Sequence, residues 1–204
     1  MRALAILAAL LLAGCNLVLT EAPLLHDTVG GPRLHLKAGQ WVMRDPDCAA
    51  FDTAQPREQW PSCASLVTIR GDTIAGQEHS AAETPVPFVL ADGAPAILQA
   101  RLDSSDMHGF VYAGAEVTGH DADGLATALR YWPVQCGPPA PNFEVQAGHY
   151  ATHSPGPGLT MTGDNCGAAD IGAVRGAAVA TRQRSSDSTT LVWLRALPGP
   201  SASH

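Results

Sequence analysis

Glycine and proline interrupt this chain so frequently that it favours short strands joined by turns. Its 204 residues include 20 glycines and 16 prolines, which are spread along the whole length. Glycine weakens the interior of a helix and proline breaks it, so few stretches remain in which a long helix could form. The sequence therefore predicts a fold dominated by β-structure and turns.

The segments between these breaks are rich in β-branched and aromatic residues, as strands typically are. Two of the turns contain Asp-Gly pairs, Asp92-Gly93 and Asp123-Gly124, which favour hairpins. The second pair separates the two longest strand candidates. We expect strands at residues 41–44, 65–70, 86–90, 95–102, 109–118, 125–134 and 189–197.

One helix is expected, late in the chain, over residues 170–182, and Asp170 is placed to cap its first turn. A shorter helical turn is expected around residues 56–60. The predicted fold class is therefore mainly β with one C-terminal helix (α+β), an antiparallel meander followed by that helix and a closing strand. The predicted helix has one mostly apolar face formed by Ile171, Val174, Ala178 and Thr181.

The first fifteen residues have the layout of an export signal. A positive start, Met1-Arg2, precedes an unbroken apolar run over residues 3–12 and two small residues before Cys15. As a helix this run would span about 15 Å, half the hydrocarbon core of a bilayer, which is too short for a transmembrane segment. We expect residues 1–14 to be a cleaved signal peptide.

The end of this signal, Leu12-Ala13-Gly14-Cys15, resembles the lipobox of bacterial lipoproteins at all four positions. The resemblance implies that the Cys15 thiol forms a thioether to a diacylglycerol and that a dedicated peptidase cuts before Cys15. It also implies that the new amino terminus receives a further fatty acyl chain, such as palmitate. Several acyl chains make a stable membrane anchor, whereas one would be marginal. The alternative is an ordinary cleaved signal that happens to end at a cysteine.

The residue after Cys15 bears on the location of such a lipoprotein. In enteric bacteria aspartate at this position is the usual signal for retention in the inner membrane, and here it is Asn16. We therefore expect a lipid-anchored protein that faces the periplasm from the outer membrane.

Removal of residues 1–14 leaves 190 residues, enough for one domain with a sizeable core. We expect a lipidated N-terminus and tether over residues 15–36, a single β-rich domain over 37–197, and a disordered tail over 198–204. The net charge of −7 indicates an acidic surface, which argues against nucleic acid as a partner. The expected partners are the membrane, through the lipid, and an envelope protein.

Four cysteines remain once Cys15 is lipidated, and an even number in an exported chain indicates disulfides. Sequence alone allows three pairings. We expect Cys48 with Cys63 and Cys136 with Cys166, because neighbours in the chain meet at the smallest loop-closure cost. A zinc site is the alternative, but no C-x-x-C spacing supports it.

No catalytic residues, metal ligands or cofactors are predicted. His149 and His153 are four residues apart, but no glutamate follows His149 as a metalloprotease helix would require. The chain lacks the G-x-S-x-G, P-loop and G-x-G-x-x-G motifs. Acidic residues and histidines in two turns could offer ligands for a cation, although such residues usually only cap and solvate turns: Asp103, Asp106, His108, His120, Asp121 and Asp123.

The segment Gly39-Gln40-Trp41 resembles the entry motif of calycin-type barrels, such as the lipocalins and the small periplasmic barrel inhibitors of metalloproteases. The resemblance implies a tryptophan packed across the barrel floor, often under an arginine from the last strand. Trp41 and Arg195 match those two positions and are therefore candidate ligand-binding residues. The alternative is that Trp41 is simply a core aromatic residue at the start of a strand.

Three functions follow from these patterns. The leading hypothesis is a lipid-anchored envelope protein with a non-enzymatic binding or structural role. The second is a barrel that binds a small ligand or inhibits a protease, with an apolar cavity or a free N-terminal strand. The third is a hydrolase, which would require His108, His149 or His153 to meet a serine or carboxylate.

Overall fold

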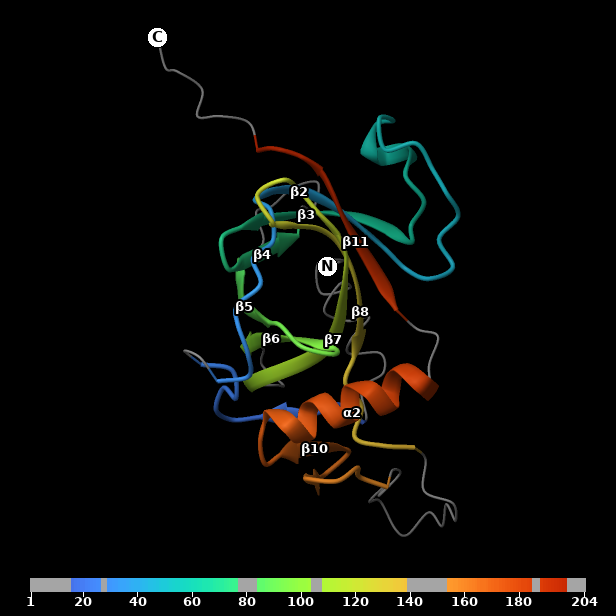
Figure 1. Cartoon of the computed structure of the whole chain (residues 1–204). Coiled ribbons are helices and arrows are strands. Elements are labelled where there is room, and N and C mark those ends of the chain that lie inside the picture. The colour runs from blue at the N-terminus through green and yellow to red at the C-terminus, as the bar shows by residue number, and fades with distance from the viewer. Residues whose placement is uncertain are drawn as a thin grey trace.

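A closed, eight-stranded antiparallel barrel forms the centre of the computed structural model (Figure 1). The structure describes residues 16–26, 29–76, 84–103, 108–138, 154–184 and 188–197. The strands of the barrel are β2 (Gly39–Arg44), β3 (Ala64–Arg70), β4 (Thr73–Gly76), β5 (Val86–Ala91), β6 (Ala96–Asp103), β7 (His108–His120), β8 (Ala126–Pro133) and β11 (Thr189–Arg195).

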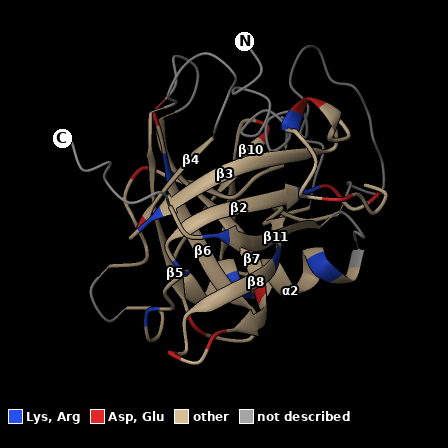
Figure 2. Ribbon diagram, turned by 90° about the horizontal axis from the view of Figure 1, so that it is seen from above, with Lys and Arg blue, Asp and Glu red and all other residues tan. Residues whose placement is uncertain are grey.

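The barrel is an up-and-down meander closed by its last strand. Strands β2 to β8 pair with their neighbours in chain order, and β11 pairs with both β8 and β2. Figure 2 shows β2, β3, β11 and β8 along one wall, with helix α2 (Ile171–Arg184) outside it. The expected fold class, mainly β with one C-terminal helix, is therefore confirmed, and the meander closes.

Most of the expected elements are present within a few residues of their predicted bounds. The expected turn near residue 56 is the 3-10 helix η1 (Arg57–Gln59), and α2 begins one residue after Asp170, whose side chain accepts the N–H of Ala173. Four short strands lacked a clear signal in the sequence: β4, β1 (Leu19–Thr20), β9 (Leu159–Thr162) and β10 (Asn165–Ala168).

Side chains alternate between the barrel interior and its outer wall, as a pleated strand requires. On β6, Ala96 and Leu98 contact the interior cluster, whereas Ile97 contacts a second cluster outside the wall. The interior cluster has these buried members: Leu36, Trp41, Met43, Val67, Ile69, Phe88, Leu90, Ala96, Ala115, Ala126, Leu129 and Leu191.

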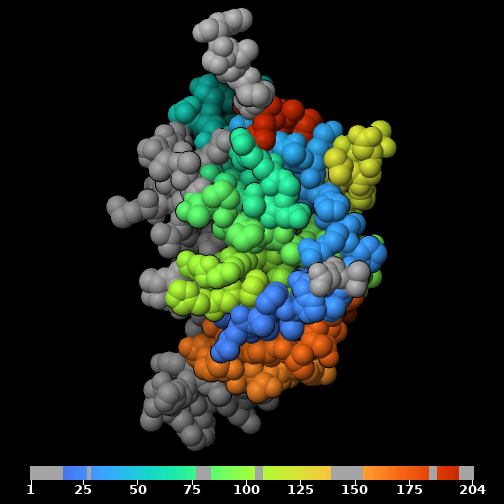
Figure 3. Space-filling model, turned by 90° about the vertical axis from the view of Figure 1, so that its left-hand side faces the viewer, coloured from blue at the N-terminus to red at the C-terminus, as the bar shows by residue number. Residues whose placement is uncertain are grey.

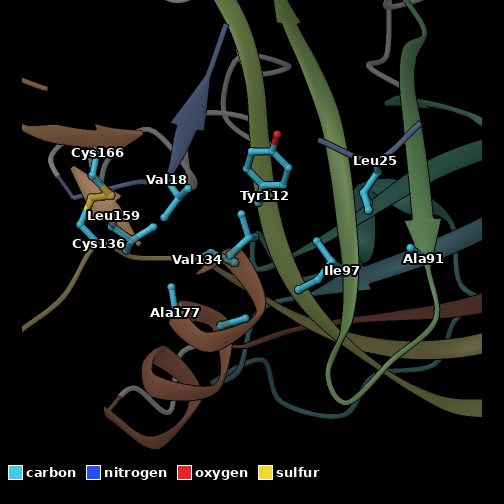
Figure 4. Packing of buried hydrophobic residues seen from close by; sticks show 12 residues of the cluster. Val18, Leu25, Ala91, Ile97, Tyr112, Val134, Cys136, Leu159, Cys166 and Ala177 are labelled. Atoms are coloured by element: carbon cyan, nitrogen blue, oxygen red, sulfur yellow. A yellow bond between two sulfur atoms is a disulfide. The ribbon is translucent and has the colours of Figure 1, made fainter. Parts of the chain in front are cut away.

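The second cluster lies between the outer wall and a layer made of α2, the N-terminal segment and the β9–β10 hairpin (Figure 4). Val174, Ala177 and Ala178 of α2 pack against Ile97, Tyr112 and Val134 of the wall. At about 25 cal/mol per Å² of buried apolar surface, such packing supplies most of the stability of a helix this short.

Polar contacts fix the position of α2 on the wall. The Trp132 indole donates to the carbonyl of Ala178 (2.9 Å), and the Arg175 guanidinium donates to three backbone carbonyls. At the other end of the helix, Arg182 lies over the Trp132 ring and shares Glu116 with Arg130. Hydrogen bonding from Arg130 holds the pKa of Glu116 below its usual value, so Glu116 is ionised at neutral pH.

The N-terminal segment from residue 16 to residue 26, which lies within the expected tether over residues 15–36, is packed into this layer. Leu17, Val18 and Leu25 are 2%, 0% and 2% exposed, and β1 pairs with β7. The segment packs here because its side chains are apolar. In a free linker they would expose surface to water that the wall of the barrel can bury.

Both expected disulfides are present, which excludes zinc at these cysteines. Cys136 and Cys166 join the segment that follows β8 to β10, with their Cα atoms 5.8 Å apart. Cys48 and Cys63 close the segment between β2 and β3, named here the insertion (residues 45–63), with Cα atoms 5.5 Å apart. The insertion and the layer that holds β10 lie at opposite ends of the molecule in two views (Figures 1 and 3).

No helix within the described residues is long and apolar enough to cross a membrane. Residues 1–15 and 198–204 lie outside the described part of the chain.

Candidate functional site

One end of the barrel is crossed by a short segment that precedes β2, named here the strap (residues 32–38). Its first half bonds to β5, where the Leu34 N–H donates to the carbonyl of Leu90 (2.8 Å). Its second half bonds to β8, where the Lys37 N–H donates to the carbonyl of Ala126 (2.9 Å). Strands β6 and β7 separate β5 from β8 in the sheet, so the strap spans this end of the barrel.

The strap closes its end of the barrel with apolar side chains. Leu34 and Leu36 both contact the interior cluster, and Leu36 is buried. Trp41 lies just beyond them, has no exposed surface and donates from its indole N–H to the carbonyl of Lys37 (2.9 Å). In this structure Trp41 is therefore a core residue that connects the strap to the barrel interior.

Gly39, the glycine of the Gly-x-Trp segment, lies where β11 comes too close for a larger residue. A Cβ atom on Gly39 would overlap the indole nitrogen of Trp193 and the carbonyl oxygen of Arg195. Trp41 and Trp193 are cross-strand partners, so both indoles stand on the same face of the sheet. Glycine at residue 39 therefore allows β11 to close the barrel beside Trp41.

A lysine lies above the tryptophan at this end. Lys37 Nζ is 4.6 Å from the centre of the Trp193 ring and 3.0 Å from Asp121 Oδ2. The lysine lowers the pKa of Asp121, whose other oxygen accepts the N–H groups of Asp123 and Leu125. These contacts join the strap to the β7–β8 turn and to β11.

Arg195 does not occupy the position that the calycin resemblance implies. Its guanidinium donates to the side-chain oxygen of Gln40 (2.6 Å), and the two residues are partners across a bulged part of the β2–β11 pair. Neighbours on a strand point to opposite faces, so Gln40 and Trp41 face different sides of the wall. The structure thus does not bring Arg195 and Trp41 together.

The opposite end of the barrel, where β2 ends and the insertion begins, is named here the insertion end. Tyr131 and Ala100 point into the interior in the halves of their strands nearest this end, and Ala100 keeps part of its surface exposed. Leu98 and Ile74 also face the interior and are also partly exposed. The interior lining is therefore largely apolar, and part of the surface of Ala100, Leu98 and Ile74 is exposed.

Tyr131 brings a polar group into this lining. Its hydroxyl donates to the sulfur of Met43 (3.1 Å) and also bonds to Thr189. Burial raises the pKa of Tyr131 to about 12, so this hydroxyl is a neutral donor and acceptor at physiological pH. Apolar walls with few polar groups are the usual composition of a small-molecule site.

The start of the described chain forms a second notable site, named here the N-terminal junction (residues 16–18). The Asn16 N–H donates to the carbonyl of Asp164 (2.6 Å), in the β9–β10 turn. The Leu17 N–H donates to Asn165 Oδ1 (2.9 Å), and the Val18 N–H donates to the carbonyl of Val134 (3.0 Å). Three successive residues are thus hydrogen-bonded to the layer around the Cys136–Cys166 disulfide.

Asn16 has the only positive φ of a non-glycine residue in the described ranges, +97°. Its side-chain amide donates to the carbonyl of Gly137 (3.1 Å) and accepts the Gly137 N–H (3.3 Å). Asparagine tolerates positive φ better than most residues. Asn16 is also buried, with 7% of the whole residue exposed. The junction therefore begins at the residue directly after Cys15.

The remaining candidate residues do not form a catalytic or metal site within the described ranges. His108 Nδ1 lies 3.7 Å from Asp103 Oδ1 on the surface, and no cluster of three or more histidine, cysteine, aspartate or glutamate residues could hold a metal there. Asp106, His149 and His153 lie outside the described residues, as does Cys15.

The strap and the N-terminal junction were not predicted, because Pro23 and the Gly30-Gly31-Pro32 break indicated a tether over residues 15–36. A signal was present in the apolar residues of this segment. Leu17-Val18-Leu19 and Leu24-Leu25 are unusual in a solvated tether, and Leu34-His35-Leu36 alternates as a strand would.

Comparisons with protein-family models, with curated proteins and with solved structures found no match for this chain.

Proposed function

We propose that this protein is an exported lipoprotein, anchored through lipid on Cys15, whose barrel is a non-enzymatic binding domain facing the periplasm. The observation that carries the binding role is the apolar barrel interior, several of whose side chains keep part of their surface exposed. The lipobox resemblance of Leu12-Ala13-Gly14-Cys15 supports the anchor. The two disulfides support export, because such bonds persist in oxidising compartments.

The anchor is tested by growing cells with a labelled fatty acid and comparing the wild type with Cys15→Ala. We expect label and membrane association in the wild type and neither in the variant. A matched control removes two other cysteines, Cys48→Ala with Cys63→Ala, and should keep its label. Equal labelling of Cys15→Ala and the wild type would rule out the anchor.

The outer membrane is the proposed location because Asn16, and not aspartate, follows the lipidated cysteine. Separation of inner and outer membranes on a density gradient should place the wild type in the outer-membrane fraction. Recovery in the inner-membrane fraction would contradict this part of the proposal.

Binding of a small apolar ligand inside the barrel is the specific form of this function that the interior favours. Ile74, Leu98 and Ala100 face inwards and yet stay partly exposed, which is the arrangement expected of an open binding site. The described N-terminal residues give no support to an inhibitor that inserts a free N-terminal strand into a protease, because residues 16–20 are bonded to the β9–β10 hairpin and the outer wall of the barrel.

The ligand site is tested with the apolar fluorescent probe N-phenyl-1-naphthylamine. We expect the probe to bind the wild type and to lose most of its binding to Ala100→Phe, because the larger ring fills the insertion end. Val179→Phe is the control, since Val179 is 39% exposed on α2, away from the interior. Equal binding to all three proteins would exclude the interior as the site.

A further inference from the structure

The N-terminal junction leaves no linker between the lipid and the domain. If Cys15 carries the lipid, as proposed above, the first residue after it is Asn16, which is already hydrogen-bonded to Asp164 and Gly137. Consecutive Cα atoms are only about 3.8 Å apart. A flexible linker of about twelve residues would by contrast allow a separation of about 20 Å.

We propose that the domain rests directly on the bilayer, with the β9–β10 hairpin facing the lipid and the insertion pointing away. This inference rests on the proposed lipidation of Cys15. The β9–β10 turn is the nearest part of the fold, because the Asn16 N–H bonds to Asp164 within that turn. The insertion lies at the far end of the molecule from β10 (Figures 1 and 3).

The charge of the β9–β10 hairpin and that of the insertion agree with this orientation. Residues 154–169, which include β9 and β10, contain one charged side chain, that of Asp164. The insertion contains five: Asp45, Asp47, Asp52, Arg57 and Glu58. Charged groups lose hydration when they approach a bilayer, so the weakly charged β9–β10 hairpin can lie against it at low cost.

The same geometry sets the direction in which the barrel opens. The layer that holds the junction packs against the outer wall of β7 and β8, and not against either end of the barrel. Figure 1, which looks along the barrel, shows α2 and β10 beside the wall. The barrel therefore lies with its wall towards the membrane, and its insertion end opens sideways, along the membrane surface.

The orientation is tested with the full-length lipidated protein in vesicles of phosphatidylethanolamine and phosphatidylglycerol that contain a headgroup-bound nitroxide quencher. A fluorescent non-natural amino acid replaces one of two exposed threonines, Thr162 beside the β9–β10 turn or Thr53 in the insertion. We expect several-fold stronger quenching at Thr162 than at Thr53. A Gly-Ser linker of about twelve residues between Cys15 and Asn16 should remove most of that difference.

Equal quenching at Thr162 and Thr53 in the protein without the linker would overturn the orientation while leaving the anchor intact. A difference that the linker does not change would also overturn it, because the junction would then not be its cause. Failure of the anchor is recognised separately, since Cys15→Ala would then bind the vesicles as well as the lipidated protein does.

Discussion

At Asn16 and Tyr131, single side chains make contacts that no pattern in the sequence announces. Asn16 uses both ends of its amide to bond the backbone of Gly137, and Tyr131 places its hydroxyl against the sulfur of Met43. In both cases the partner is more than 80 residues away in the chain. Such roles depend on the closed fold and could not be predicted from local sequence.

Replacement of Asn16 by alanine should destabilise the protein by about 1–3 kcal/mol, because it leaves buried backbone groups of Gly137 without partners. The positive φ of residue 16 adds to this cost. Urea unfolding of the lipidated protein in detergent micelles measures the effect. Thr162→Ala, an exposed change nearby, should stay within about 0.5 kcal/mol of the wild type, and equal stabilities of all three proteins would contradict the role of Asn16.

The buried hydroxyl of Tyr131 should make the free energy of unfolding of the protein fall as the pH rises above about 10. Its pKa is raised by burial to about 12, whereas an unfolded tyrosine titrates near pH 10. Between these values the unfolded chain has lost a proton that the folded protein keeps, so rising pH favours unfolding, by up to about 1.4 kcal/mol per pH unit. Urea unfolding at pH 9 and 11 should show a smaller loss in Tyr131→Phe than in the wild type; equal losses would show that the hydroxyl is not buried.

Strands with β-branched and aromatic residues were predictable as elements, and the short strands were not. The sequences of β9 and β10, LTMT and NCGA, are held by their pairing and by the Cys136–Cys166 disulfide, not by strand composition. The chain forms a closed barrel, but the face on which Arg195 lies follows from a bulge in β11 that no sequence pattern marks.

Replacement of one glycine in β2 and one in α2 by alanine should change the stability of the protein in opposite directions. Gly39→Ala should destabilise by about 1–3 kcal/mol, because its methyl group overlaps Trp193 and the backbone of Arg195. Gly176→Ala should stabilise by about 0.5–1 kcal/mol, because a methyl group there meets no neighbour and alanine favours the helix. Thermal and urea unfolding measure both, and a stabilising Gly39→Ala would contradict the described closure of the barrel.

For the whole molecule, the fold class and both disulfide pairs were predictable because loop-closure cost and strand patterns act over short distances in the chain. The attachment of residues 16–26 to the outer wall was not predictable, since it joins β1 to β7, about 90 residues further along. In the proposed orientation, that attachment holds the domain against the membrane. A domain on a linker would rotate freely, whereas this one is bonded from the first residue after Cys15.

The central claim is that Cys15 is the lipid-bearing first residue of the mature protein. The most direct measurement is mass spectrometry of the tryptic N-terminal peptide, because no lysine or arginine lies between Cys15 and Arg33. We expect a peptide that begins at Cys15, ends at Arg33 and carries a diacylglycerol and a further acyl chain. A peptide that begins at another residue, or that begins at an unmodified Cys15, would contradict the anchor and the orientation derived from it.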